Sequence, residues 1–179
     1  MKTIKLLAIV FISTLVFTAC SDDHDDDHDH SDEELITTVL YTLTDSSGFI
    51  TLQWEDLDGD TGNTPTITSG TFTANTIYTG TVQLLNRTES PAEDITIEVK
   101  AEGDEHEFFY SNTAGLTITK TDTDGTNPLG IETTLTTGNA GSGTLTIILK
   151  HEPTKPNDGT AAGAGGSTDV EVTFPITVQ

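Results

Sequence analysis

The chain has 179 residues, and its 29 acidic residues outnumber 7 basic ones, giving a formal net charge of −22 at pH 7. So negative a surface repels phosphate backbones and anionic lipid headgroups, which excludes nucleic-acid binding and electrostatic membrane adhesion. Apolar residues make up 34% of the chain, below the roughly 45–50% of ordinary globular domains. The 36 threonines nevertheless favour strands, because Thr is β-branched.

Residues 1–19 have the features of a secretory signal peptide. Two lysines precede an apolar run over residues 6–17, which is too short to span a bilayer comfortably and is followed at once by acidic residues. The only cysteine, Cys20, ends a Phe-Thr-Ala-Cys segment that resembles a bacterial lipobox, with Phe17 in place of the usual Leu. The resemblance implies acylation of Cys20, with chains such as palmitate anchoring the mature protein to a membrane.

The segment that follows the cysteine is strongly acidic. Ser21-Asp22-Asp23 resembles the short signal that sends lipoproteins of Bacteroidetes to the outer face of the outer membrane, the alternative being a simple acidic spacer. Removal of the signal leaves 5 basic against 29 acidic residues, a formal charge of −24. Residues 21–34 contain no apolar residue, so with Cys20 they are expected to form a lipidated, disordered tether over residues 20–34.

Three histidines stand among the carboxylates of this tract. His24, His28 and His30, interleaved with Asp, offer the imidazole and carboxylate donors that suit Zn²⁺, Cu²⁺ or Ni²⁺. A disordered tract cannot hold a preformed site, so such binding is expected to be labile. The alternative is a solvated spacer whose histidines are incidental.

The remaining residues, 35–179, are predicted to form one all-β domain. Apolar residues alternate with polar ones in short runs bounded by Gly, Asn, Asp and Pro. The runs cover residues 35–43, 49–54, 76–85, 116–120, 131–137, 144–151 and 168–178. About eight such strands with Thr on the outer face predict an immunoglobulin-like, two-sheet antiparallel β-sandwich, with a closed barrel as the alternative.

Three segments interrupt this pattern. Ser90-Pro91 followed by acidic residues predicts a short helix over about 91–102 that crosses between the sheets, although residues 95–99 also suit a strand. Pro175 lacks an N–H and should lie at a sheet edge or a bulge. Residues 153–167 are rich in Gly, Ala and Pro and are predicted to form a mobile loop.

Catalytic motifs are missing from the sequence, which contains no nucleophile elbow, phosphate-binding loop, dinucleotide fingerprint or zinc-protease helix. We therefore expect a protein that is not an enzyme. Two domain histidines, His106 and His151, stand beside acids, and the strand alternation places His151 on the inward face. If they meet with Glu105 or Glu152, they form a structured metal site; otherwise they are ordinary hydrogen-bonded residues.

One loop resembles a calcium site. Asp56, Asp58 and Asp60 place oxygen donors at alternate positions, and Asn63 follows three residues later, with glycines in between, as in calcium loops. The loop lacks the distant bidentate Glu of an EF-hand, and a polar hairpin turn explains it equally well. Residues 122–127 are a second, shorter example.

The ordered succession of these segments resembles a family of small lipoproteins from flavobacteria and their relatives. The resemblance covers nearly the whole chain, including Trp54 to Asp60, Asp104 to Phe109 and Lys150 to Pro153. Members often bear the label "type 1 periplasmic binding fold superfamily protein", but this chain is about half the length of that α/β fold and lacks its alternation of strands and helices. The resemblance implies an accessory partner of a TonB-dependent outer-membrane receptor.

The sequence thus predicts a surface lipoprotein that captures a divalent transition metal, Zn or Cu, for such a receptor. The alternative is an immunoglobulin-like structural or adhesive module stabilised by Ca. A third hypothesis is carbohydrate or heme binding by Trp54 and the aromatic run at residues 108–110, the alternative being that these aromatic side chains belong to the core.

Overall fold

The computed structural model describes residues 34–59 and 62–179, and over these residues the chain forms eleven strands and two short helices. In chain order they are β1 (Thr38–Asp45), β2 (Gly48–Glu55), β3 (Thr66–Thr68), β4 (Gly70–Phe72), β5 (Ile77–Asn86), β6 (Glu93–Asp94), α1 (Thr96–Ala101), β7 (His106–Asn112), β8 (Thr117–Lys120), β9 (Glu132–Thr136), β10 (Gly141–His151), α2 (Ala161–Ala164) and β11 (Ser167–Val178). Three strands have three residues or fewer, which leaves eight longer ones. Seven of these correspond to the predicted runs, and β7 is the eighth.

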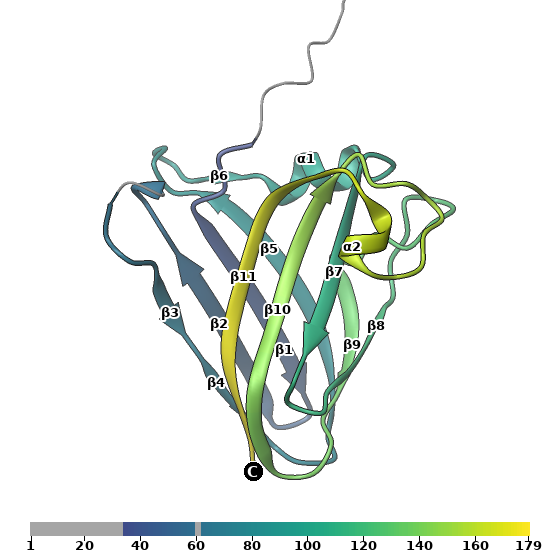
Figure 1. The fold of residues 1–179 in the computed structure, drawn as a ribbon. Helices are drawn as coiled ribbons and strands as arrows, with labels where there is room; N and C mark the ends of the chain where they lie inside the picture. The colour runs from purple at the N-terminus through teal and green to yellow at the C-terminus, as the bar shows by residue number, and fades with distance from the viewer. Residues whose placement is uncertain (1–33, 60–61) are drawn as a thin grey trace, which may run out of the picture. The chain divides into compact units, whose positions relative to one another are not determined.

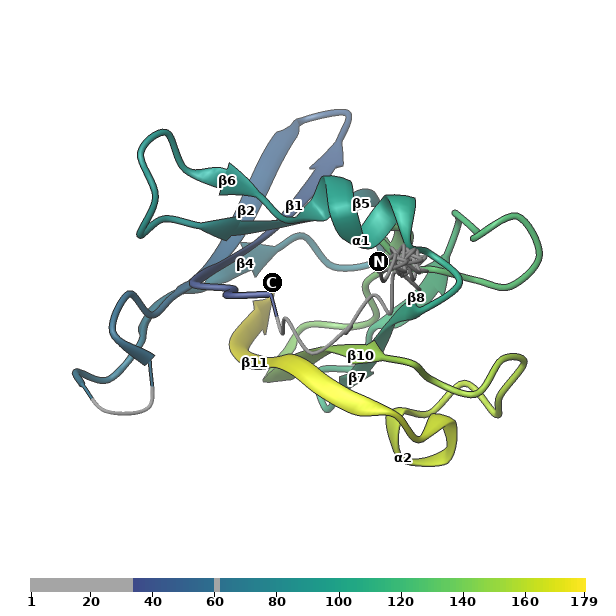
Figure 2. The same ribbon diagram turned by 90° about the horizontal axis from the view of Figure 1, so that it is seen from above.

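The strands form two sheets that pack face to face (Figures 1 and 2). The larger has the order β3-β2-β1-β5-β9-β8, with β6 paired to β5, and the smaller has the order β4-β11-β10-β7. All named strand pairs are antiparallel except that of β4 with β11. The predicted all-β sandwich is confirmed; two separate sheets over the described residues do not form the closed barrel.

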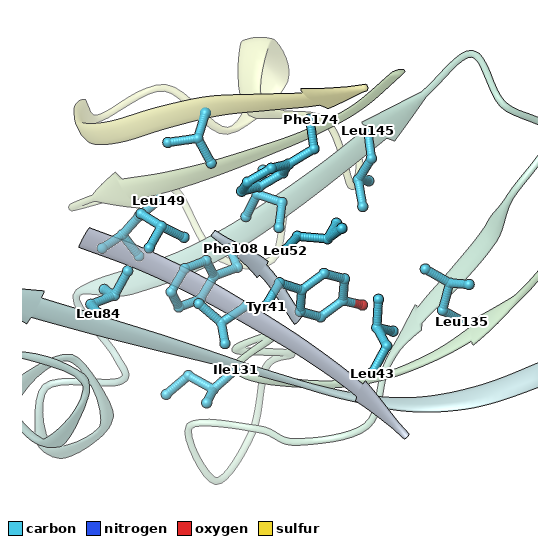
Figure 3. Close-up of a cluster of buried hydrophobic side chains, with 14 of the residues drawn as sticks. Tyr41, Leu43, Leu52, Leu84, Phe108, Ile131, Leu135, Leu145, Leu149 and Phe174 are labelled. Atoms are coloured by element: carbon cyan, nitrogen blue, oxygen red, sulfur yellow. The ribbon is translucent and has the colours of Figure 1, made fainter. Parts of the chain in front are cut away.

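Alternation of apolar residues explains the core between the sheets (Figure 3). In β1 the side chains of Val39, Tyr41 and Leu43 are fully buried. In β11 every second residue from Val170 to Val178 points inward and is at most 9% exposed. Burying one such apolar side chain contributes about 1.5–3 kcal/mol, so this pattern is the main source of stability.

Two segment boundaries differ from the prediction. Leu35, the first residue of the predicted run 35–43, is 57% exposed, because β1 begins only at Thr38. The helix begins at Thr96 rather than at 91, because residues 93–94 instead pair with the end of β5. Ile95 and Val99, four residues apart, are buried as a helical spacing requires.

The predicted mobile loop is anchored to the sheet. The Lys155 ammonium, 6% exposed, donates to the carbonyl oxygens of Gly103 and His106 and pairs with Asp124. Thr160 caps α2 by accepting a hydrogen bond from the Gly163 N–H. These polar contacts order the loop although its composition suggests none of them.

Strand β7 departs from alternation because both of its faces are covered. Phe108 points into the core, while Phe109 on the other face lies beneath Lys120, whose Nζ is 4.3 Å from the ring centroid. Pro175 lies where expected: β4 pairs with β11 only from residue 176, so the strand is an edge at Pro175. Among the described residues no helix is long and apolar enough to cross a membrane.

Candidate metal centre

Two groups of ionisable side chains share His106 and together contain five residues. Strand β7 begins with this histidine, at the end of the sandwich where α1 lies (Figure 1). The five residues come from segments far apart in the sequence: the residue run before β1, the end of α1, the first residue of β7, the last residue of β10 and the start of β11. We call this set the His106 centre; its members are Glu34, Glu102, His106, His151 and Asp169.

The two histidines lie directly opposite each other on neighbouring strands. The antiparallel register of β7 and β10 pairs His106 with His151, and their rings stack with centroids 4.8 Å apart and planes 16° apart. The His106 side chain is fully buried, whereas that of His151 is 16% exposed. Strand pairing therefore brings together two imidazoles that are 45 positions apart in the chain.

The two nitrogens of His106 have different surroundings. Nδ1 lies 3.2 Å from the carbonyl oxygen of Glu102, so this nitrogen carries the proton that the carbonyl accepts. Nε2 faces two carboxylates, at 3.6 Å from Glu34 Oε1 and 3.8 Å from Asp169 Oδ2. Both distances exceed those of N–H···O hydrogen bonds, and within the described part of the chain Nε2 has no hydrogen-bond partner.

The distances from His106 Nε2 to the two carboxylate oxygens are close to those between two ligands of one metal ion and are too long for hydrogen bonds. Zn²⁺ binds nitrogen and oxygen at about 2.0–2.2 Å, which puts neighbouring tetrahedral ligands roughly 3.3–3.6 Å apart. The ligand atoms of His106, His151 and Asp169 all lie within 4.8 Å of one another, as do those of Glu34, Glu102 and His106. Nδ1 bonded to a backbone carbonyl is also the usual outer-sphere contact of a metal-binding histidine.

The electrostatic surroundings of His106 favour positive charge. Burial by itself lowers the pKa of this imidazole, but the Glu34 carboxylate, the Glu102 carbonyl and the Asp169 carboxylate outweigh burial. The pKa of His106 is therefore raised above its usual value. The same negative groups would stabilise a metal cation held at Nε2.

A β-bulge directs Asp169 into the centre. In the pairing of β10 with β11, Leu149 lies opposite Val170 and Lys150 lies opposite Thr168, so Asp169 has no opposite residue. Strict alternation would put Asp169 on the outer face, beside the inward Val170. The bulge instead leaves its side chain 2% exposed and within reach of His106. Bulges frequently redirect side chains next to functional sites.

The acids that the sequence associates with the two histidines have smaller roles. Glu105 Oε2 lies 3.8 Å from His151 Nε2, close enough for an ion pair when His151 is protonated. The Glu152 N–H donates to the Glu105 carbonyl oxygen, and its side chain is exposed. Neither carboxylate belongs to the two groups of ligand atoms found in the described residues.

The carboxylates of both predicted calcium loops accept hydrogen bonds from their own turns. Asp56 accepts from the N–H groups of Asp58 and Gly59, and Asp58 accepts from the backbone and side chain of Asn63. Asp124 in the second loop accepts from the N–H groups of residues 126 and 127. Asp60 lies outside the described residues, and the calcium site stays a prediction.

The lipidation residue Cys20 and the tract histidines His24, His28 and His30 also lie outside the described residues. Three members of the His106 centre were not predicted: Glu34, Glu102 and Asp169. Glu34 was assigned to the tether, yet its side chain is only 12% exposed. Alternation assigns Asp169 to the wrong face because it does not foresee the bulge. The position of Glu102 depends on where α1 ends, which the sequence does not fix.

Comparison of the chain with protein families, curated proteins and solved structures found no match. The resemblance to small flavobacterial lipoproteins accordingly stays a prediction.

Proposed function

We propose that the protein binds a divalent transition metal, Zn²⁺ or Cu²⁺, at the His106 centre and is not an enzyme. One observation carries the proposal. The buried Nε2 of His106 faces two carboxylates at 3.6 and 3.8 Å, and the His106 ring stacks on a second histidine ring. Buried polar atoms in proteins are almost always hydrogen-bonded, so an unbonded one needs a further partner. A metal cation would satisfy the nitrogen, and the carboxylates of Glu34 and Asp169 lie near enough to contribute ligand atoms to it.

The donor set determines which cations suit the site. Two imidazoles with carboxylates match Zn²⁺, Cu²⁺ and related ions, whereas Ca²⁺ and Mg²⁺ prefer sites made of oxygen alone. Several carboxylates around one cation also offset the free-energy cost of removing that cation from water, whereas uncharged ligands would not. The centre therefore supports a transition metal rather than calcium.

The biological setting of the proposal follows from the N-terminal sequence. Lipidation at Cys20 would hold the protein on the outer membrane, facing outward, and His24, His28 and His30 would give ions a labile first contact. The His106 centre, built on strands and starting four residues after His30, would hold the ion more tightly. Such a protein would serve as an accessory to a TonB-dependent receptor.

Calorimetric titration of Zn²⁺ and Cu²⁺ into the full chain in detergent tests the proposal. Replacement of His24, His28 and His30 by Ala should remove a weak class of sites and leave one tighter site. In that background Asp169→Asn, which preserves side-chain volume, should weaken the tighter site by roughly 10- to 100-fold or more, as losing even an outer-sphere partner commonly does.

Glu132→Gln is the matched control, because it removes an exposed carboxylate from a strand of the other sheet. It should leave the affinity unchanged. Circular dichroism and melting temperature establish that each variant is folded. The proposal fails if the triple-alanine protein has no site tighter than millimolar, or if Asp169→Asn binds as tightly as its parent.

A further inference from the structure

A cleft of about 570 Å³ adjoins the His106 centre. It lies between the segment before β1, the loop after β2 and the start of β11. Two members of the centre, Glu34 and Asp169, belong to its wall. Glu34 and Asp169 thus connect the wall of the cleft with the surroundings of His106 Nε2.

The wall of the cleft carries negative charge only. Besides Glu34 and Asp169 it contains Asp56, Asp58 and Glu171, and none of its lining residues is Lys, Arg or His. A concave surface lined by one sign of charge focuses the electric field and raises the local concentration of the opposite ion. The cleft therefore attracts small cations and repels anions.

An acidic surface alone would not identify a ligand, but two carboxylates of this wall also lie next to a buried donor. His106 Nε2 is fully buried, lacks a hydrogen-bond partner among the described residues, and faces two carboxylates of the cleft wall. A water molecule occupies about 30 Å³ of liquid, so an ion with six waters needs roughly 200 Å³. The cleft has room for a divalent ion that still carries its hydration shell.

We propose that this cleft is the entry route to the His106 centre, and that it admits the hydrated divalent cation in preference to an anionic metal chelate. The inference rests on the metal binding proposed above and adds the chemical form of the ligand. An ion attracted into the cleft exchanges its waters for Glu34 and Asp169 and then for the imidazole. A metal chelate whose carboxylate groups make it an anion is repelled by the same negative field.

Trp54 gives a direct measurement of entry. It is the only tryptophan of the chain and lines the cleft together with Glu34 and Asp169. Bound Cu²⁺ quenches nearby tryptophan fluorescence, so stopped-flow mixing of Cu²⁺ with the full chain measures the association rate. The background carries alanine at His24, His28 and His30, so that the signal comes from the folded domain.

Glu171→Lys reverses one charge of the cleft wall without touching a proposed ligand. It should lower the association rate of Cu²⁺ by roughly three- to tenfold at low ionic strength, and the difference should shrink near 1 M salt, where the Debye length is about 3 Å. Glu132→Lys makes the same charge change at an exposed strand position of the other sheet. It should change the rate by less than about twofold, because its charge lies outside the cleft.

Cu²⁺ offered as its anionic citrate complex should associate more slowly than the hydrated ion. Equal rates for Glu171→Lys and Glu132→Lys, or faster entry of the citrate complex, would overturn the entry route while leaving metal binding intact. A calorimetric titration without any tight site would instead overturn the proposed function itself. The two failures are therefore distinguishable.

Discussion

His106 occupies an environment that a buried neutral imidazole would not tolerate well without a further partner. Its Nδ1 is bonded to the Glu102 carbonyl, which leaves the lone pair of Nε2 directed toward Glu34 and Asp169. A lone pair and two carboxylates repel one another until a proton or a metal ion lies between them. At the scale of the single residue, the surroundings of Nε2 favour a cation, either a proton or the metal ion proposed above.

Tyr41 provides a test of the core at the same scale. Its hydroxyl lies 2.7 Å from Thr133 Oγ1, and burial raises the pKa of its phenol to about 12, the Thr133 hydrogen bond opposing this effect only in part. In the unfolded chain the phenol ionises near pH 10. The folded state therefore has its full stability below pH 10 and loses about 2–3 kcal/mol as the pH rises from 10 to 12.

Tyr41→Phe should flatten this alkaline loss. At neutral pH the variant should be less stable by about 1 kcal/mol, because the Thr133 hydroxyl loses its partner. Between pH 10 and 12 its free energy of unfolding, measured by urea denaturation, should fall less steeply than that of the parent. Parallel curves over that range would show that the Tyr41 phenol does not control the alkaline transition.

At the scale of elements, the bulge in β11 decides whether a carboxylate reaches the centre. Between the pairs Leu149–Val170 and Lys150–Thr168, Asp169 is the extra residue in β11, and no residue of β10 lies opposite it. Deletion of Asp169 would restore a regular ladder. The variant should remain folded and should bind Zn²⁺ at least about 10- to 100-fold more weakly by calorimetry.

A second variant tests whether Zn²⁺ binding needs the bulge itself or only an aspartate near this position. Thr168→Asp combined with deletion of Asp169 keeps an aspartate beside Val170 but places it opposite Lys150, whose ammonium already contacts Thr168 Oγ1. This aspartate should face outward and should not restore Zn²⁺ binding. Parental affinity in this variant would contradict the role assigned to the bulge.

Alternation in the sequence predicts those strands that have one buried face and one solvent-exposed face. Alternation located β1, β2, β5 and β8 to β11 to within a few residues, because each has polar residues on its outer face. Strand β7 was not predicted, since its first four residues are buried on both faces.

The centre was harder to predict than the sandwich. The sequence suggested His106 and His151 because each stands among acids, but their meeting depends on strand register, which local patterns do not contain. Asp169 depends on a bulge that breaks the alternation used to assign its face. Glu34 ends an acidic tract whose composition favours disorder, and only the fold shows its contact with His106.

At the scale of the whole molecule, the His106 centre joins the two sheets. Glu34 immediately precedes the run into β1 of the larger sheet, while His106, His151 and Asp169 belong to strands of the smaller one. A metal ion bound by both sets would cross-link the layers of the sandwich. Unfolding would then require release of the ion, so metal binding and global stability are linked.

Metal at the centre should accordingly raise the melting temperature. With free Zn²⁺ at 100 times the dissociation constant, a ligand that binds only the folded state contributes about 2.7 kcal/mol. For a domain of this size each kcal/mol raises the melting temperature by roughly 2–4 °C, which predicts an increase of about 5–11 °C in scanning calorimetry. Addition of a chelator should reverse it.

This measurement also separates the centre from the N-terminal tract. The sequence predicts a tract without fixed structure, and ions held by His24, His28 and His30 alone would then bind the folded and unfolded chains about equally. Such binding leaves the melting temperature unchanged. At the same zinc concentration, Asp169→Asn should therefore reduce the zinc-induced increase to about half or less, whereas alanine at the three tract histidines should preserve it. The opposite pattern would mean that binding specific to the folded state depends on the tract histidines, and it would contradict a cross-link at the His106 centre.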